Sequence, residues 1–257
     1  MTPKSPSRDP FAALRGLTRA RIGLGRAGQA LPTAPLLAFQ LAHARAVDAV
    51  HADMDATAIQ AALGRPSLVV ASAAPDRRTY LQDPEQGRRL DPGASIPQGL
   101  KPDLAIVIAD GLSATAVNAH AATLVAALDQ RLTDWTLAPI VLARQARVAL
   151  GDPIGERLGA RCVVVLIGER PGLSAADSLG AYITWSPKPG LRDSERNCVS
   201  NIGTDGGLTL ETAADKIAWL LNQARRLGLT GVDLKDRHGQ IALPSTAPCA
   251  LPPEESA

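Results

Sequence analysis

Short hydrophobic runs recur through the middle of the chain and alternate with segments of helical periodicity. The runs "LAIVIA" and "CVVVLIG" are apolar at nearly every position, which is typical of strands that are buried on both faces of a sheet. From these runs we predict strands over Leu68–Ala71, Leu104–Ala109, Ile140–Ala143, Val163–Ile167 and Tyr182–Trp185.

Helices are predicted around these strands, where apolar residues recur at helical spacing. They cover Pro35–His51, Asp55–Leu63, the segment after Ser113 and Thr209–Leu227. Ser113 is a residue type that caps helix N-termini well, and Gly228 is a typical helix stop. Because strands and helices alternate, the pattern predicts an α/β fold with a mostly parallel sheet and flanking helices.

The same pattern divides the chain into four parts. We predict a disordered leader over residues 1–17, an arm with helices over 18–64, the α/β domain over 65–243, and a disordered tail over 244–257. The arm contains Gly23, Gly25 and Gly28 in the G-x-G-x-x-G spacing of a dinucleotide site. No buried strand precedes these glycines, and prolines follow where a helix interior would be. We therefore predict an extended arm that lies across a partner.

Composition narrows the classes of function. The 257 residues carry 27 basic and 25 acidic side chains and only 3% aromatic residues, so neither nucleic acid nor an anionic membrane is an expected partner. No apolar run approaches the roughly 20 residues of a membrane helix. The three cysteines are far apart and form no C-x-x-C pair, which argues against structural zinc and disulfides. We expect no metal site and a reducing, cytoplasmic setting.

Polar side chains follow several of the predicted strands. In open α/β sheets, ligands bind in the crevice at the carboxyl ends of the strands. The residues that follow the strands there are Asp110 and Ser113, Val148 and Asp152, Glu169 and Asp177, and the polar segment "RDSERNCVSNIGTDGG". We predict that these loops form a binding crevice. Nucleophile-elbow, zinc-protease and phosphate-loop motifs are absent from the sequence, so we predict no catalytic residue.

From the residues alone, three interpretations remain open. The chain is a binding subunit of a larger enzyme, a self-contained α/β enzyme that acts on a nucleotide or sugar phosphate, or a scaffold that only stabilises a partner. The first predicts inactivity without a partner, the second predicts activity from this chain alone, and the third predicts that the crevice residues are dispensable for ligand affinity.

Four segments resemble those of one known family, in the same order. They are "TRARIGLGRAGQALPTAPLLAFQLAHARAVDAVH", "ADGLSATAV", "VVVLIGERPGLSAADSLGAY" and "SERNCVSNI". The sequence is similar to the small (light) subunit of ethanolamine ammonia-lyase from about Thr18 to Arg237. This resemblance implies a Rossmann-like domain in an adenosylcobalamin-dependent radical enzyme that converts ethanolamine to acetaldehyde and ammonia. It also implies a large-subunit partner with a TIM barrel, present in equal numbers, and in some hosts a bacterial microcompartment.

The resemblance also assigns cofactor contacts to three residues of this subunit. They are Val148 in "ARVALGD", Glu169 in "GERPGL" and Cys198 in "ERNCVSNI". Asp110, Ser113 and Asn201 are weaker candidates, chosen from their loop positions alone. Cobalamin enzymes that replace the cofactor's own base carry D-x-H-x-x-G. Here Ile241 stands where that motif needs glycine, so we expect base-on adenosylcobalamin.

Overall fold

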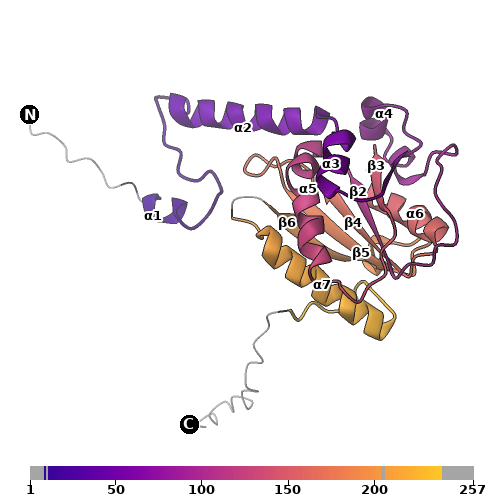
Figure 1. Cartoon of the computed structure of the whole chain (residues 1–257). Helices are drawn as coiled ribbons and strands as arrows, with labels where there is room; N and C mark the ends of the chain where they lie inside the picture. Colours follow the sequence, from indigo (N-terminus) through magenta and orange to yellow (C-terminus); the bar gives the residue numbers. More distant parts are fainter. Residues whose placement is uncertain (1–8, 10, 204–205, 239–257) are drawn as a thin grey trace, which may run out of the picture.

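The computed structural model describes residue 9, residues 11–203 and residues 206–238. Figure 1 shows a sheet flanked by helices, with an N-terminal segment that extends away from it. The predicted tail over residues 244–257 lies outside the described residues, as does most of the predicted leader. Within the described ranges, no helix is both long enough and apolar enough to cross a membrane.

Strands and helices alternate through the α/β domain, as the sequence pattern predicts. The helices are α1 (Ala12–Arg15), α2 (Thr33–His51), α3 (Ala56–Leu63), α4 (Arg77–Gln82), α5 (Ala114–Asp129), α6 (Gly151–Leu158) and α7 (Leu210–Leu227). The strands are β1 (Ser67–Ala71), β2 (Leu104–Ala109), β3 (Ile140–Arg144), β4 (Cys162–Gly168), β5 (Leu179–Trp185) and β6 (Asn197–Ile202). Single 3₁₀ turns cover Gln86–Arg88, Val148–Leu150 and Asp193–Glu195.

The six strands form one mixed sheet in the order β1-β3-β2-β4-β5-β6. The pairs β1–β3, β3–β2 and β2–β4 are parallel, whereas β5 pairs antiparallel with both β4 and β6. The predicted Rossmann-like, mostly parallel sheet therefore holds for β1 to β4 only. Residues 169–178 join β4 to β5 without a helix, and a connection this short cannot make the crossover that parallel neighbours require.

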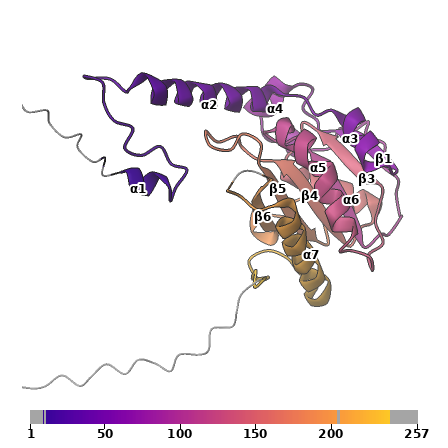
Figure 2. The ribbon, with the colours of Figure 1, turned by 60° about the vertical axis from the view of Figure 1, so that its left-hand side comes forward.

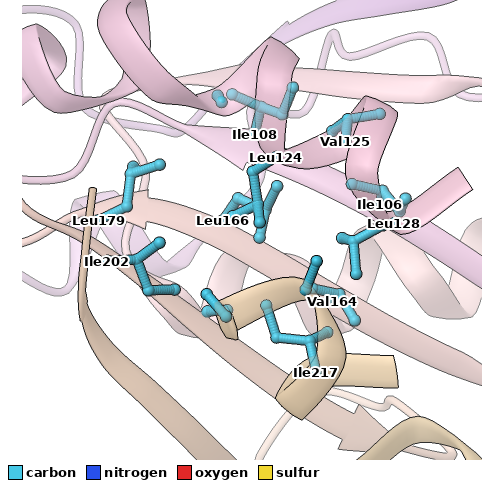
Figure 3. Close-up of a cluster of buried hydrophobic side chains, with 14 of the residues drawn as sticks. Ile106, Ile108, Leu124, Val125, Leu128, Val164, Leu166, Leu179, Ile202 and Ile217 are labelled. Atoms are coloured by element: carbon cyan, nitrogen blue, oxygen red, sulfur yellow. The ribbon is translucent and has the colours of Figure 1, made fainter. Parts of the chain in front are cut away.

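The core lies on both faces of the sheet, because side chains alternate along each strand. On one face, β2 and β4 pack beneath α5 and α7, and Figure 3 shows Ile106, Ile108, Val164 and Leu166 near Leu124, Leu128 and Ile217. On the other face, Val107 of β2 and Val163 and Val165 of β4 pack with Ile154 and Leu158 of α6. The predicted continuous burial of these strands is confirmed: every residue of β2 and β4 is buried.

Helix ends follow the predicted caps. The side chains of Asp55, Ser113 and Thr209 each accept a hydrogen bond from the backbone N–H three residues later, at the starts of α3, α5 and α7. Each such cap typically stabilises a helix by about 1 kcal/mol. Gly228 ends α7 in the left-handed conformation that glycine adopts without strain.

Besides α1, which lies within the predicted disordered leader, three helices or strands were not predicted from the sequence. β6 was taken as part of a polar loop, because only Val199 and Ile202 of its six residues are buried, which is the pattern of an edge strand. α4 has only Tyr80 buried. α6 contains Gly151, Pro153 and Gly155, so its composition resembles a loop.

The N-terminal arm and α2 leave a large apolar surface uncovered. Figures 1 and 2 both show α2 extending beyond the sheet, and among its 19 residues only Ala49 is buried. Leu37 and Leu41 of α2 are 57% and 52% exposed. The arm that precedes α2 forms no strand–helix unit at the glycine spacing, in agreement with the rejection of a dinucleotide site. Its Arg21 donates a hydrogen bond to the Leu173 carbonyl, at 3.1 Å.

Candidate functional site

The carboxyl ends of β2, β3, β4 and β6 meet at one edge of the sheet. β6 shares this edge because it is antiparallel to β5, which is itself antiparallel to β4. A cavity of about 440 Å³ opens there. Its lining consists of Tyr80, Gly111, Leu112, Arg147, Val148, Ile167, Gly168, Glu169, Arg170, Tyr182 and Asn201. The loops that follow β2, β3 and β4 therefore do form a cavity at this edge, as predicted, and its role in binding stays a prediction.

The floor of the cavity depends on two glycines. A Cβ atom on Gly168 would lie 2.0 Å from the Ser113 carbonyl oxygen, and one on Gly111 would lie 2.2 Å from the Gly168 carbonyl oxygen. Gly111 also has a φ of +57°, which is the left-handed region. Only glycine lets the ends of β2 and β4 approach so closely, and this approach brings the loops after the two strands together.

Glu169 is held at the end of β4 by two neighbours. Its Oε2 accepts a hydrogen bond from the Ser178 hydroxyl and another from the Asn201 backbone N–H, at 3.1 Å. Its Oε1 has no hydrogen-bond partner among the described residues. A Cβ on Gly180 would lie 3.0 Å from that oxygen, so glycine leaves the carboxylate room. Glu169 therefore lines the cavity as a fixed hydrogen-bond acceptor.

Val148 begins the 3₁₀ turn that joins β3 to α6, and it lines the cavity as a half-buried apolar residue. Arg147, the residue before it, packs its guanidinium 4.2 Å from the centre of the Tyr80 ring. Tyr80 is completely buried, and its hydroxyl donates to the Ala146 carbonyl, at 3.1 Å. Burial raises the pKa of Tyr80 to about 12. This side of the cavity is thus an apolar surface beside a positioned cation.

Cys198 lies next to the cavity, in β6, and not in a loop as predicted. It pairs with Tyr182 across the β5–β6 ladder, and Tyr182 does line the cavity. Desolvation raises the pKa of the Cys198 thiol, and the nearby Glu169 raises it further, while a hydrogen bond from Tyr182 opposes this. A thiol with a raised pKa stays protonated near neutral pH and is a poor nucleophile. Desolvation also raises the pKa of Tyr182.

The weaker candidates separate into two groups. Asn201 lines the cavity, but Asp110 and Ser113 have structural roles. The buried Asp110 accepts hydrogen bonds from the backbone N–H groups of Gln145 and Ala146, at 2.8 and 3.0 Å, and burial raises its pKa. Ser113 caps α5 and donates to the Ala176 carbonyl, at 2.7 Å. Both side chains tie neighbouring loops together instead of facing a ligand.

Two further carboxylates of the predicted loops lie elsewhere. Asp152 was expected in a loop but lies buried in the first turn of α6, where it pairs with Arg196. Asp177 lines a different cavity, between α2 and the loop after β4. A larger cavity of about 720 Å³ also exists, beside Arg88 and Arg192, but its lining includes none of the three residues that the resemblance assigns.

Tyr80, Arg147 and Tyr182 are among the lining residues that sequence reasoning missed. Tyr80 lies in the unpredicted α4 and far from any strand end in the sequence. Arg147 directly precedes Val148, so proximity in the sequence was an available signal. Tyr182 was assigned to a strand, and only the antiparallel course of β5 brings it to this edge.

Comparison with known proteins identifies relatives along most of the chain. The family model described as "Ethanolamine ammonia-lyase light chain (EutC)" matches residues 8–235. A protein named "Ethanolamine ammonia-lyase small subunit" from Azotobacter vinelandii is 52% identical over 249 residues, which covers 92% of each chain. One of the same name from Xanthomonas campestris pv. campestris is 51% identical over 247 residues, covering 91% of this chain and 90% of the relative. Another, from Pseudomonas aeruginosa, is 49% identical over 260 residues, covering 96% and 94%. These comparisons do not support a self-contained enzyme for a nucleotide or sugar phosphate.

Proposed function

Because this chain belongs to the ethanolamine ammonia-lyase light chain family, we propose that it is the small subunit of an adenosylcobalamin-dependent ethanolamine ammonia-lyase. It binds the cofactor in the cavity at the carboxyl ends of β2, β3, β4 and β6. The observation that carries this proposal is the convergence of Val148 and Glu169 on one cavity, with Cys198 adjacent through Tyr182.

The residues at this edge fit a corrinoid. Such a cofactor combines a broad apolar ring with amide side chains that donate and accept hydrogen bonds. Val148, Leu112 and Ile167 offer apolar contact, while the unpartnered Oε1 of Glu169 can accept from an amide N–H. The cavity is smaller than a corrinoid, so much of the cofactor remains for a second subunit to cover.

The chain's own residues bind and orient the cofactor and exclude water from one side of it. When bound, adenosylcobalamin supplies the radical chemistry that converts ethanolamine to acetaldehyde and ammonia. We propose that the cofactor keeps its own base. In support, His238 packs against Trp219 of α7, with ring centres 6.2 Å apart, and is not among the residues that line the cavity. Ile241, on which the sequence argument rests, lies outside the described residues.

We further propose that the large-subunit partner, a TIM barrel, docks on the arm and α2. Leu36, Leu37, Phe39, Leu41 and Val47 of α2 are all at least 39% exposed. A contiguous apolar surface of this kind marks a protein–protein interface. We also propose that the two subunits are present in equal numbers. The complex is cytoplasmic, within a microcompartment in some hosts.

A steric block tests the proposed function. The chain is co-expressed with its large subunit, and adenosylcobalamin binding and acetaldehyde formation are both measured. Val148→Trp places a large ring in the cavity, so the complex should assemble but lose most of its cofactor affinity. Val232→Trp is the matched control, because Val232 is 61% exposed and does not line the cavity. Full cofactor affinity in Val148→Trp, or turnover by this chain alone, would reject the proposal.

A further inference from the structure

One lining residue has charge and hydrogen-bonding capacity that the fold does not use. Arg147 lines the cavity and also two further spaces that adjoin it, of about 170 and 510 Å³. Within the described ranges, no carboxylate lies within salt-bridge distance of its guanidinium. Arg77, the other arginine packed on Tyr80, is by contrast 3.7 Å from the buried Asp110.

The hydrogen bonds of the two arginines differ in the same way. Arg77 donates to the Val50 and Gly111 carbonyls, at 2.7 and 2.9 Å. Among the described residues, the Arg147 side chain donates only from Nη2 to the Tyr80 carbonyl, at 3.1 Å, although a guanidinium has five N–H donors. Its Nε is buried without a partner, whereas Nη1 is not among the buried unpartnered atoms. Nη1 is therefore accessible from the spaces that Arg147 lines.

The position of Arg147 is fixed before any ligand arrives. Its guanidinium stacks on the buried Tyr80, and its backbone N–H donates to the Gly87 carbonyl, at 2.8 Å. A Cβ on Gly87 would lie 2.9 Å from Cγ of Arg147, so the stem is tightly packed as well. A planar guanidinium held in this way matches the geometry of phosphate oxygens, and little entropy is lost when it binds them.

We propose that Arg147 binds the phosphodiester of the cofactor's nucleotide tail, an inference that rests on the proposed cobalamin function. The phosphodiester carries a negative charge at neutral pH, whereas the side chains of the corrin ring are neutral amides. Glu169 and Val148 then contact the corrin. Arg147, which lies between the cavity and the two adjoining spaces, fixes the direction in which the nucleotide tail leaves the cavity.

The test compares two corrinoids that differ in the tail. Adenosylcobinamide keeps the corrin, its amides and the adenosyl group but lacks the phosphodiester and the nucleotide. Dissociation constants for both are measured by absorbance titration of the complex with its large subunit. Arg147→Met should weaken adenosylcobalamin binding by about tenfold to a hundredfold, the range for a lost charged hydrogen bond. Adenosylcobinamide binding should stay within about twofold.

Arg144→Met is the matched control, because Arg144 ends β3, is exposed and does not line the cavity. Equal loss for both corrinoids in Arg147→Met, no loss for either, or a selective loss in Arg144→Met would overturn the inference. The ³¹P chemical shift of bound adenosylcobalamin is a second readout, and it should differ between wild type and Arg147→Met. A wild-type complex that binds neither corrinoid would instead reject the proposed function itself.

Discussion

The buried pair of Asp152 and Arg196 allows a quantitative prediction of stability. Their side chains are only 2% and 1% exposed, and two hydrogen bonds of 2.7 Å join them in bidentate geometry. Arg196 also donates to the Thr184 hydroxyl, at 2.9 Å. The pair thus connects α6, on one face of the sheet, to the start of β6 and the end of β5. Val148 lies three residues before α6 begins, so this pair also supports the cavity.

Asp152→Asn removes the charge that neutralises Arg196 and leaves an uncompensated buried cation. Breaking a buried pair in this way costs about 3–5 kcal/mol. For a domain of this size, 1 kcal/mol lowers Tm by about 2–4 °C, so the expected fall is about 6–20 °C. Asp193→Asn is the control, because Asp193 is 84% exposed and lies 3.7 Å from the same guanidinium. Its effect should stay below about 1 kcal/mol.

Urea unfolding followed by tryptophan fluorescence measures both variants. Trp185 reports from the end of β5, beside Thr184. The double variant Asp152→Leu with Arg196→Met removes both charges, and it should recover much of the lost stability because apolar residues can replace a buried pair. Equal losses in Asp152→Asn and Asp193→Asn, or a double variant less stable than Asp152→Asn, would refute this reasoning.

Three further predictions concern other parts of the chain. Glu169→Gln should weaken adenosylcobalamin binding by about ten- to a hundredfold with little change in turnover at saturating cofactor; a rate loss of about 10²–10⁴ with affinity intact would instead indicate an acid–base role. Hydrogen bonds from Thr136, first from its backbone N–H, hold the pKa of Asp103 below its usual value. This stabilisation is present above the unfolded-state pKa and is lost as pH falls through the folded-state pKa, so urea midpoints should fall less in Asp103→Asn than in wild type below about pH 4. Leu37→Asp with Leu41→Asp should make the isolated chain more soluble and abolish co-elution with the large subunit in gel filtration; unchanged co-elution would place the docking surface elsewhere.

Most of the fold could be predicted from the sequence wherever burial dominates a segment. β2 and β4 are buried along their whole length, so their composition alone identifies them as central strands. β6 lies at the edge of the sheet with only two buried residues, and its polar composition could not be distinguished from that of a loop. The direction of β5 depends on the length of the connection after β4, which hydrophobic periodicity does not report.

The site could be predicted only in part, for a similar reason. Strand ends locate Glu169 and Val148, because the carboxyl ends of parallel strands share an edge. Whether a polar side chain there faces a ligand or a neighbouring loop depends on the partners that the fold provides. Asp110 finds two backbone N–H groups and turns inward, whereas Oε1 of Glu169 finds none among the described residues. Both residues carry a carboxylate, so residue type does not distinguish their roles. Only the three-dimensional structure separates the two.

Three titratable side chains at or beside the cavity have pKa values that are shifted away from neutral pH. Tyr80 and Tyr182 both have raised pKa values, and the raised pKa of Cys198 keeps its thiol protonated. A general acid or base works best when its pKa lies near the operating pH, and all three groups are shifted away from it. Hydrogen-bonding groups and apolar surface therefore meet at this edge beside three groups whose pKa values are shifted away from neutral pH, as expected if this chain positions a cofactor whose chemistry is completed against another subunit.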